Sequence, residues 1–252
     1  MNLGMFLDGS RAVRNVAVAD VAAGGSIGTA AATVDNYDVA IISQTTANQV
    51  LSNPAPTDTS RYKTFRWYNA GSVAIWTTGG RFIPVGSFAD FLYVPGTGWK
   101  DDQLNRPQTI AQSGTALTCP ADTAENTLVT VTFPAGVIGA TGRIVVYNNW
   151  SCTGSTNTKH TRVRFGGTIL GNNSTATAAY VTLLSEATIQ NITTGTQVGT
   201  GFAGLAQATT GAVPTASIDT TSAQTLTITG QLALGSESLV LKNYSVVLHR
   251  QA

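Results

Sequence analysis

Short runs rich in Val, Ile, Thr, Tyr and Phe, separated by Gly, Asn, Pro and Ser, recur along most of this chain of 252 residues. Runs of about four to eight residues bounded by such turn-forming residues are typical of β-strands. An amphipathic helix would instead place apolar residues three and four apart over several turns, and that spacing is almost absent. The pattern therefore predicts an all-β protein.

The chain divides into four predicted segments. Residues 1–20 mix small apolar residues with charges and have no clear period, so we expect an N-terminal arm that gains order by lying on something else. Residues 21–99 predict a small β domain, and the polar stretch 100–110 predicts a linker. Residues 111–252 predict an antiparallel β-sandwich of jelly-roll type, because eight or nine strands with turns between them follow one another.

Within the small β domain, residues 63–78 are expected to form a hairpin that turns at Asn69–Ser72. Pro84 implies an edge position or a strand end nearby. Three of the four tryptophans fall in this domain and either fill its core or stack on a ligand; the core is the favoured interpretation. They are Trp67, Trp76 and Trp99.

Within the sandwich we expect strands near 115–119, 127–133, 143–152, 159–166, 177–184, 187–193, 197–204, 224–232 and 239–249. The loop TGSTNT, residues 153–158, is long enough to join its two flanking strands as a hairpin. The nearly uncharged stretch 199–224 is unusually long for a loop, which favours a binding loop or a contact between subunits. No repeat of fixed period is visible.

Charge is scarce in this chain. Charged residues make up 11% of it, and 14 Lys and Arg against 13 Asp and Glu leave a net charge of +1. A typical soluble domain carries about 25% charged residues. A surface made polar by Thr, Ser, Asn and Gln suits a protein that is packed against other copies or a larger assembly. The same balance argues against a duplex-DNA binder, whose affinity depends on neutralising several phosphates.

Catalytic and metal-binding patterns are lacking in the sequence. His160 and His249 are the only histidines, and with Cys119 and Cys152 they show no short metal-ligand spacing. Phosphate-binding and dinucleotide-binding glycine motifs are absent as well. We therefore expect a protein that is not an enzyme and has no metal or cofactor.

Two cysteines are too few for a secreted disulfide scaffold, so folding in a reducing compartment is expected. A single disulfide between Cys119 and Cys152 is the alternative. We expect no signal peptide, because the first residues have no basic start followed by an apolar run. Membrane insertion is not expected, since no run approaches about 18 apolar residues.

The densest group of cations lies in NTKHTRVRFGG, residues 157–167. In a strand, Lys159 and the apolar residues after it point one way, while His160, Arg162 and Arg164 form a row on the other face. This row, named here the basic row, is either a solvated outer face or a contact with a carboxylate-bearing neighbour, a partner subunit or a glycan. Nucleic acid is the least favoured partner, because no aromatic stacking platform is interleaved with the row.

Two stretches resemble virion proteins of tailed bacteriophages. Residues 43–80, with QTTANQ, PAPTDT and NAG, followed by GTGW, are similar to small β modules of such proteins. Residues 123–168, with TAENTL, FPAG, GATGR, WS and NTKHTRVRFGG, are similar to the start of a β-sandwich in phage fibre and capsid-decorating proteins. The resemblance implies an exposed, trimeric structural protein and supplies no catalytic residues.

The chain lacks the heptad shaft or long β-helical repeat of a tail fibre, so we expect a capsid decoration (cement) protein or short head fibre. Its expected partners are the major capsid protein and further copies of itself as a homotrimer. Its expected location is the capsid surface, after synthesis in the host cytoplasm. Arg11 and Arg14 in the arm and the basic row are the candidate contacts. The alternative is a receptor-binding tail module that recognises a host surface glycan through its Trp-bearing turns and residues 199–224.

Overall fold

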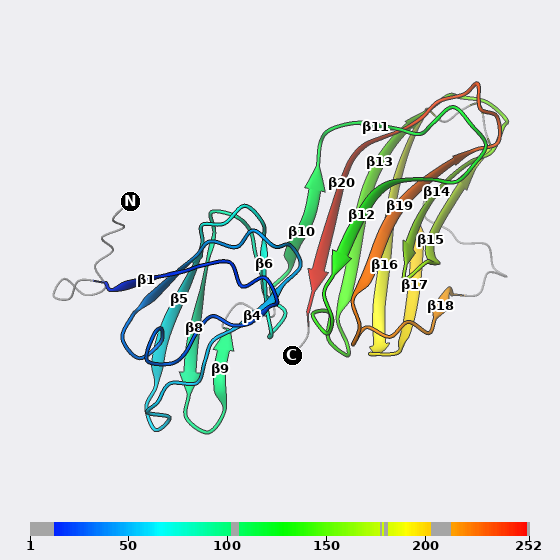
Figure 1. The fold of residues 1–252 in the computed structure, drawn as a ribbon. Coiled ribbons are helices and arrows are strands. Elements are labelled where there is room, and N and C mark those ends of the chain that lie inside the picture. The colour runs from blue at the N-terminus through cyan, green and yellow to red at the C-terminus, as the bar shows by residue number, and fades with distance from the viewer. Residues whose placement is uncertain (1–12, 102–105, 177, 179–180, 203–212, 251–252) are drawn as a thin grey trace. The chain divides into compact units, whose positions relative to one another are not determined.

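A computed structural model describes residues 13–101, 106–176, 178, 181–202 and 213–250 of the chain, with the side chains of 200–202 left out. Every regular element in these residues is a β-strand, which confirms the all-β prediction (Figure 1). The chain forms two compact units, Met1–Asn105 and Arg106–Ala252, and the boundary lies within the stretch predicted as a linker.

The first unit consists of two sheets. The five-stranded sheet has the order β1-β3-β5-β8-β9, and the four-stranded sheet has the order β2-β4-β6-β7. The strands of the five-stranded sheet are β1 (Asn15–Val18), β3 (Val39–Ile42), β5 (Lys63–Asn69), β8 (Phe88–Val94) and β9 (Gly98–Asp101). Those of the four-stranded sheet are β2 (Gly25–Ser26), β4 (Val50–Ser52), β6 (Ile75–Thr77) and β7 (Phe82–Ile83).

The chain winds between these two sheets, with β1 to β6 falling alternately in one and the other. Successive strands of the same sheet are therefore parallel, from β1 to β5 and from β2 to β6. Asn15 pairs with Val39, and Val39 pairs with Arg66. The number of residues between paired positions is larger in the second case, so successive turns of the winding differ in length. This variation explains why the sequence shows no fixed period although the backbone repeats its path.

The predicted hairpin over residues 63–78 is wrong. β5 pairs with β3 and β8, whereas β6 pairs with β4 and β7 in the other sheet. After β5 the chain continues along the segment that follows β3: Ala70 N donates to Ile42 O at 2.8 Å and Ser72 N donates to Gln44 O at 2.9 Å. The NAGS stretch thus carries the chain from one sheet to the other.

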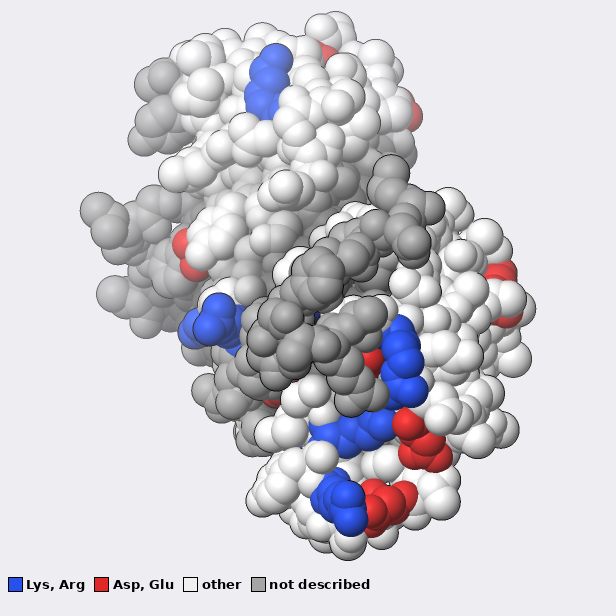
Figure 2. Space-filling model, turned by 90° about the vertical axis from the view of Figure 1, so that its left-hand side faces the viewer, with Lys and Arg blue, Asp and Glu red and all other residues white. Residues whose placement is uncertain are grey.

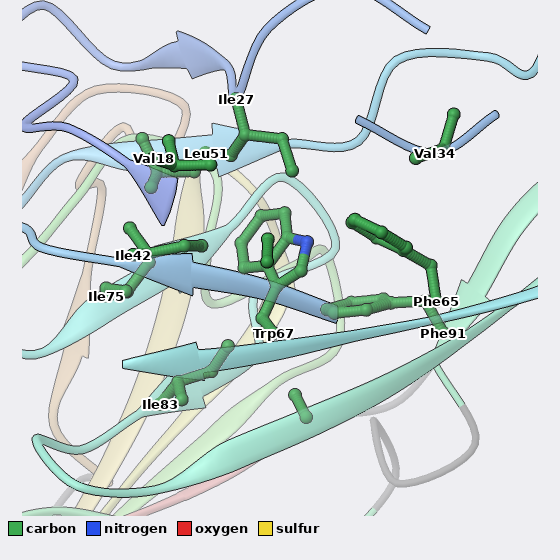
Figure 3. Packing of buried hydrophobic residues seen from close by; sticks show 12 residues of the cluster. Val18, Ile27, Val34, Ile42, Leu51, Phe65, Trp67, Ile75, Ile83 and Phe91 are labelled. Atoms are coloured by element: carbon green, nitrogen blue, oxygen red, sulfur yellow. The ribbon is translucent and has the colours of Figure 1, made fainter. Parts of the chain in front are cut away.

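The core of the first unit lies between its two sheets (Figure 3). Alternation along β5 sends Phe65 and Trp67 inward, where the Trp67 ring lies 4.9 Å from that of Phe91. Trp76 is buried, and Trp99 is half-buried with its ring 5.3 Å from that of Tyr93. The tryptophans are therefore packing residues, as the favoured interpretation predicted. β7 ends before Pro84 at the edge of its sheet, in agreement with the proline signal.

The second unit is a sandwich of two antiparallel sheets (Figure 1). The first sheet has the order β10-β20-β13-β16-β17-β18, with β11 also on β20, and the second has the order β12-β19-β14-β15. The strands of the first sheet are β10 (Gln108–Ser113), β11 (Leu117–Thr118), β13 (Arg143–Cys152), β16 (Thr182–Thr193), β17 (Thr196–Phe202), β18 (Thr215–Ala216) and β20 (Leu239–His249). Those of the second sheet are β12 (Asn126–Phe133), β14 (Lys159–Phe165), β15 (Thr168–Thr175) and β19 (Gln224–Leu232).

This strand order is that of a jelly roll. Eight strand positions, with β10 and β11 sharing the first, form the orders β10/β11-β20-β13-β16 and β12-β19-β14-β15, and the chain crosses between the sheets as two Greek keys require. β17 and β18 extend the first sheet beyond β16. The sheets touch closely where Gly171 of β15 faces Ala187 of β16, since a β-carbon on Gly171 would lie 2.6 Å from that of Ala187.

The structure corrects several of the segments and strands predicted from sequence, and it adds β15 (Thr168–Thr175), where no strand was predicted. Residues 15–18, assigned to the arm, form β1 of the first unit, and β10 begins inside the predicted linker. β13 and β14 lie in opposite sheets, so the loop 153–158 is a crossover and not a hairpin. β16 is one long strand where two were predicted. Of the stretch 199–224, residues 203–212 lie outside the described residues.

Candidate functional site

The basic row lies on β14, on the face of its sheet that points away from the sandwich core. Burial alternates strictly along this strand, with Thr161, Val163 and Phe165 buried and His160, Arg162 and Arg164 half-buried. The predicted division of the strand into two faces is confirmed. The outward residues are not a freely solvated row, because their side chains are largely covered by neighbouring strands.

Glu125, directly before β12, binds both arginines of the row. Arg164 donates to its two carboxylate oxygens from Nε and Nη2, each at 2.7 Å, and Arg162 Nη1 donates to Oε2 at 2.9 Å. Thr229 Oγ1 of β19 donates to Oε1 at 2.6 Å. A bidentate guanidinium–carboxylate pair of this kind is among the stronger surface interactions. The carboxylate-bearing neighbour of the row is therefore a residue of the same unit.

The two guanidinium groups also fix the surrounding backbone and side chains. Arg162 Nη1 donates to Gln231 Oε1 at 2.8 Å, and Arg164 Nη1 donates to Gly167 O at 2.9 Å. Hydrogen bonds from Arg164 and Thr229, together with the charges of both arginines, lower the pKa of Glu125 to about 2. The cluster is thus a closed charge network whose donors face an internal acceptor.

The stability of this network should depend on pH in a defined window. The pKa of Glu125 is about 2 in the folded chain against an ordinary value of 4.5, so its contribution is complete above pH 4.5 and is lost as the pH falls toward 2. Solvent reaches the cluster, so we expect a loss of about 2 kcal/mol. Thermal unfolding from pH 7 to pH 2.5 should show wild type and Glu125→Gln converging below pH 4.5. A constant gap between them would contradict this role.

His160 occupies the end of the basic row and is half-buried on the outer face of β14. Its Nδ1 atom is buried and has no hydrogen-bond partner among the described residues. Burial and the charge of Arg162 lower its pKa, although Glu125 opposes that effect. The imidazole is therefore neutral at neutral pH and packs beside the arginines.

Lys159 behaves differently from the rest of the predicted strand. It falls in the core-facing set and is only 1% exposed, with Nζ 2.9 Å from Glu237 Oε2. Nζ also donates to Ser155 Oγ at 2.5 Å and to Asn157 O at 2.9 Å. Hydrogen bonds from Lys159, Ser155 and Asn157 lower the pKa of Glu237 to about 2. This ion pair ties the crossover 153–158 to the turn before β20.

A second candidate surface lies on the first unit, on the face of the five-stranded sheet that points away from the core. It is hollowed into a groove of about 700 Å³ with a mainly apolar lining. Phe88 is 55% exposed and Leu92 39% exposed, although both are large apolar residues. The residues that line this sheet groove are Val13, Asn15, Asp38, Val39, Ile41, Thr64, Phe65, Arg66, Tyr68, Gly86, Phe88, Asp90, Phe91 and Leu92.

One ion pair interrupts the apolar lining of the sheet groove. Arg66 donates to Asp90 from Nε at 2.5 Å and from Nη2 at 2.8 Å, across the β5–β8 ladder. The guanidinium carbon of Arg66 also lies 4.6 Å from the centre of the Phe88 ring. At the end of the groove near β1, Arg14 N donates to Asp38 Oδ2 at 3.0 Å. The groove therefore combines apolar walls with charges that are already paired.

Comparisons with known proteins do not assign the chain to a family. No family model matches it, and no curated protein matches its sequence. Dimeric latent PorU from Porphyromonas gingivalis is 7% identical over 57% of this chain and 13% of its own length, with a TM-score of 0.31. The CBM2 module of the evolved Dit of Lactobacillus casei BL23 phage J-1 is 9% identical over 49% of this chain and 70% of its own, with a TM-score of 0.26.

A third structure, the VP2 subviral particle of infectious bursal disease virus, is 13% identical over 67% of this chain and 43% of its own, with a TM-score of 0.28. Two of these three neighbours are thus viral proteins, and the chain spans less than half the length of PorU and VP2. At TM-scores this low, none of these likenesses carries an argument about function.

The remaining predicted contact residues lie in the first unit. Arg14 is partly exposed, with Nε 3.8 Å from Asp38 Oδ2, and Arg11 lies outside the described residues. Their role in binding a partner stays a prediction, as does that of the basic row. Of the five predicted contact residues, His160, Arg162 and Arg164 lie together on β14 of the second unit, and Arg14 lies in the first unit.

Metal-ligating side chains do not gather in the part of the chain that the structure describes. No group of three or more His, Cys, Asp or Glu side chains is placed there to hold a metal ion, and no helix is long and apolar enough to cross a membrane. Cys119 and Cys152 are not joined by a disulfide. They flank Leu239 on opposite edges of β20, about 10 Å apart, which is beyond disulfide reach.

Sequence reasoning missed Glu125, Glu237 and the sheet groove. Glu125 stands alone before a strand, and only the fold brings it beside β14. Lys159 carried a signal, because a lysine in a core-facing register needs a buried acidic partner. The sheet groove also had a signal in the sequence. The segment FADFLYV of β8 has large apolar residues on both faces, although only one face of its sheet packs on the core.

Proposed function

We propose that this protein is a structural component of a phage virion that binds the outside of the head as a decoration protein or short head fibre. The first unit would attach to the major capsid protein, and the jelly roll would trimerise and face outward. The observation that carries the proposal is that charged side chains are few and are paired with opposite charges within each unit.

Charged side chains in the described residues are repeatedly paired within their own unit. In the first unit Arg66 pairs with Asp90. Arg81 pairs with Asp101 at 3.5 Å between Nη1 and Oδ1, and both of these side chains are largely buried. In the second unit Glu125 binds two arginines and Glu237 binds Lys159. Figure 2 shows a face on which charged side chains are few, and in its lower part blue groups lie beside red ones. Such a surface suits close packing with neutral neighbours and does not suit a polyanion.

The jelly-roll topology agrees with this proposal by analogy only. Jelly rolls recur in viral capsid proteins and in lectins, and a fold alone does not assign a function. The two stretches of sequence that resemble phage virion modules favour the first of these settings. They fall one in each unit, so both units are included in the resemblance.

The proposal is tested by stoichiometric binding to phage heads. Purified protein should co-sediment with heads that lack it until a fixed number of copies per head is reached, and heads that already carry it should bind none. Mass spectrometry of intact virions should find hundreds of copies. A few copies per virion would contradict head attachment and would support a tail location.

Two of the three expected stacking residues of the glycan-binding alternative, Trp67 and Trp76, are buried in the first unit, and the third, Trp99, is half-buried. Residues 203–212 of its predicted binding loop lie outside the described residues. Saturable binding of the purified protein to host cells or their polysaccharide, without affinity for heads, would restore that alternative and overturn the proposal.

A further inference from the structure

Three side chains of complementary reactivity meet at the start of β14, where the crossover 153–158 enters the sandwich. Lys159 is only 1% exposed, and its Nζ lies 2.9 Å from Glu237 Oε2. Asn157 Nδ2 donates to the other oxygen of the same carboxylate, Oε1, at 2.8 Å. An amine and a carboxamide are thus held on the two oxygens of one carboxylate.

Stability alone does not account for this arrangement. A buried ion pair is weak evidence for stability, because the cost of removing two charges from water offsets their attraction. The ladder partner of Lys159 on β19, Leu232, shows that an apolar side chain suits this register. The neutral amine of a lysine is a nucleophile, and an adjacent carboxylate can accept the proton that masks it. The group therefore contains a nucleophile, a base and an electrophilic carbon, Cγ of Asn157.

We propose that Lys159 and Asn157 join through an amide bond between their side chains, with Glu237 as the base. Glu237 takes one proton from the Nζ ammonium, and the neutral Nζ attacks Cγ of Asn157. The carboxylate passes a second Nζ proton to Nδ2, the Cγ–Nδ2 bond breaks, and Nδ2 leaves as ammonia. The products are the Nζ–Cγ amide, ammonia and a protonated Glu237, so atoms and charge balance without a cofactor or an oxidant.

The fold supplies the conditions that this reaction needs. Lys159 Nζ donates to the backbone oxygen of Asn157 at 2.9 Å, so the lysine side chain already turns back toward the residue that it attacks. Groups held together in this way react as if they were very concentrated. The side chains of Lys159 and Glu237 are 1% and 7% exposed, which limits the access of competing water. The reaction also replaces two buried charges with neutral groups.

Intact mass spectrometry of the purified full chain tests the bond directly. The wild-type chain should weigh less than its sequence by one molecule of ammonia. Trypsin should fail to cleave after Lys159, because the amide removes the charge that the enzyme recognises. The peptide that spans residues 144–162 should therefore appear whole and carry the same deficit. A chain of full mass with normal cleavage after Lys159 would overturn the proposal.

A succinimide formed by Asn157 alone also releases ammonia and is the competing explanation of a mass deficit. It leaves Nζ of Lys159 free, so trypsin would still cleave there, and mild base would open the ring and remove the deficit. The proposed amide should resist both treatments. A deficit that disappears in mild base, with normal cleavage after Lys159, would therefore overturn the proposal as well.

Variants of the full chain identify the groups responsible. Lys159→Met and Glu237→Gln should each have full mass, because the first lacks the nucleophile and the second lacks the base. Lys242→Arg is the matched control: Lys242 is an exposed lysine of β20, so this variant should keep the deficit. A folded Glu237→Gln protein, recognised by its protected thiols, that still loses ammonia would overturn the role of Glu237.

Refolding covers the case in which Glu237→Gln does not fold. Wild-type chain recovered from inclusion bodies and kept in denaturant should have full mass, because Glu237 is distant in sequence and meets Lys159 only in the folded unit. The same chain should lose ammonia after refolding. Loss of ammonia in denaturant would overturn the role of Glu237. The bond does not depend on head attachment, so either proposal can fail alone.

Discussion

Replacing Arg162 and Arg164 together by glutamate is expected to lower the free energy of unfolding of the jelly-roll unit by about 3 kcal/mol or more. Glu125 receives three hydrogen bonds from these two side chains, at 2.7 to 2.9 Å. The double variant would put three carboxylates in the same partly buried space, where each raises the cost of ionising the others. The sequence alone predicts intact folding for this variant, because it places the basic row against solvent or a neighbour.

The two units can be followed separately during denaturation. Cys119 and Cys152 are buried thiols of the second unit, so their reaction with a thiol reagent reports on its unfolding. Three of the four tryptophans, Trp67, Trp76 and Trp99, belong to the first unit, whereas Trp150 is buried in the second. Tryptophan fluorescence in a Trp150→Phe background therefore reports on the first unit. We expect the double reversal to make the thiols reactive at lower denaturant while the transition of the first unit keeps its midpoint.

Two further variants isolate the cause of this effect. Adding Glu125→Arg to the double reversal restores opposite charges and should recover a substantial part of the lost stability. Arg61→Glu is the surface control: Arg61 pairs with Asp58 in an exposed position, so its reversal should change stability by less than about 0.5 kcal/mol. A double reversal with unchanged thiol reactivity would show that the arginines contribute little to folding and would return them to the role of an intermolecular contact.

Local pattern predicted several strands of the jelly roll well but missed β15 and divided β16. The bounds of β13, β19 and β20 agree with the predicted ranges, because alternation of apolar and polar residues marks a strand independently of its partners. Pairing was predicted poorly, because it depends on contacts far along the chain. Nearness in sequence suggested hairpins across residues 69–72 and 153–158, and in both places the chain crosses to another sheet.

The same distinction applies to the candidate surfaces. The outward direction of His160, Arg162 and Arg164 follows from the strand period and was predicted. The identity of their acidic neighbour was not, because Glu125 reaches them only through the order β12-β19-β14. The sequence of one strand does not show which strand lies beside it. The ion-pair partners of the basic row and the open face of the five-stranded sheet therefore became apparent only from the strand order.

Gly71→Ala is expected to destabilise the first unit by about 3 kcal/mol, through a clash at the crossing between its sheets. A β-carbon on Gly71 would lie 2.0 Å from the backbone oxygen of Gln44 and 2.4 Å from its nitrogen. Gln44 cannot move aside easily. It is buried, and its side chain accepts from Val21 N at 3.0 Å and donates to Thr46 O at 3.0 Å.

Denaturation followed by tryptophan fluorescence in the Trp150→Phe background should therefore show an earlier transition for Gly71→Ala, with unchanged thiol reactivity in the second unit. Gly114→Ala is the matched control, because a β-carbon there meets nothing within 4 Å. If both variants unfold like wild type, the backbone at Gln44 yields to an added methyl group. The close contact between Gly71 and Gln44 would then not be what holds β5 and β6 in separate sheets. The buried side chains of β5 and β6 would instead prevent the two strands from pairing as a hairpin.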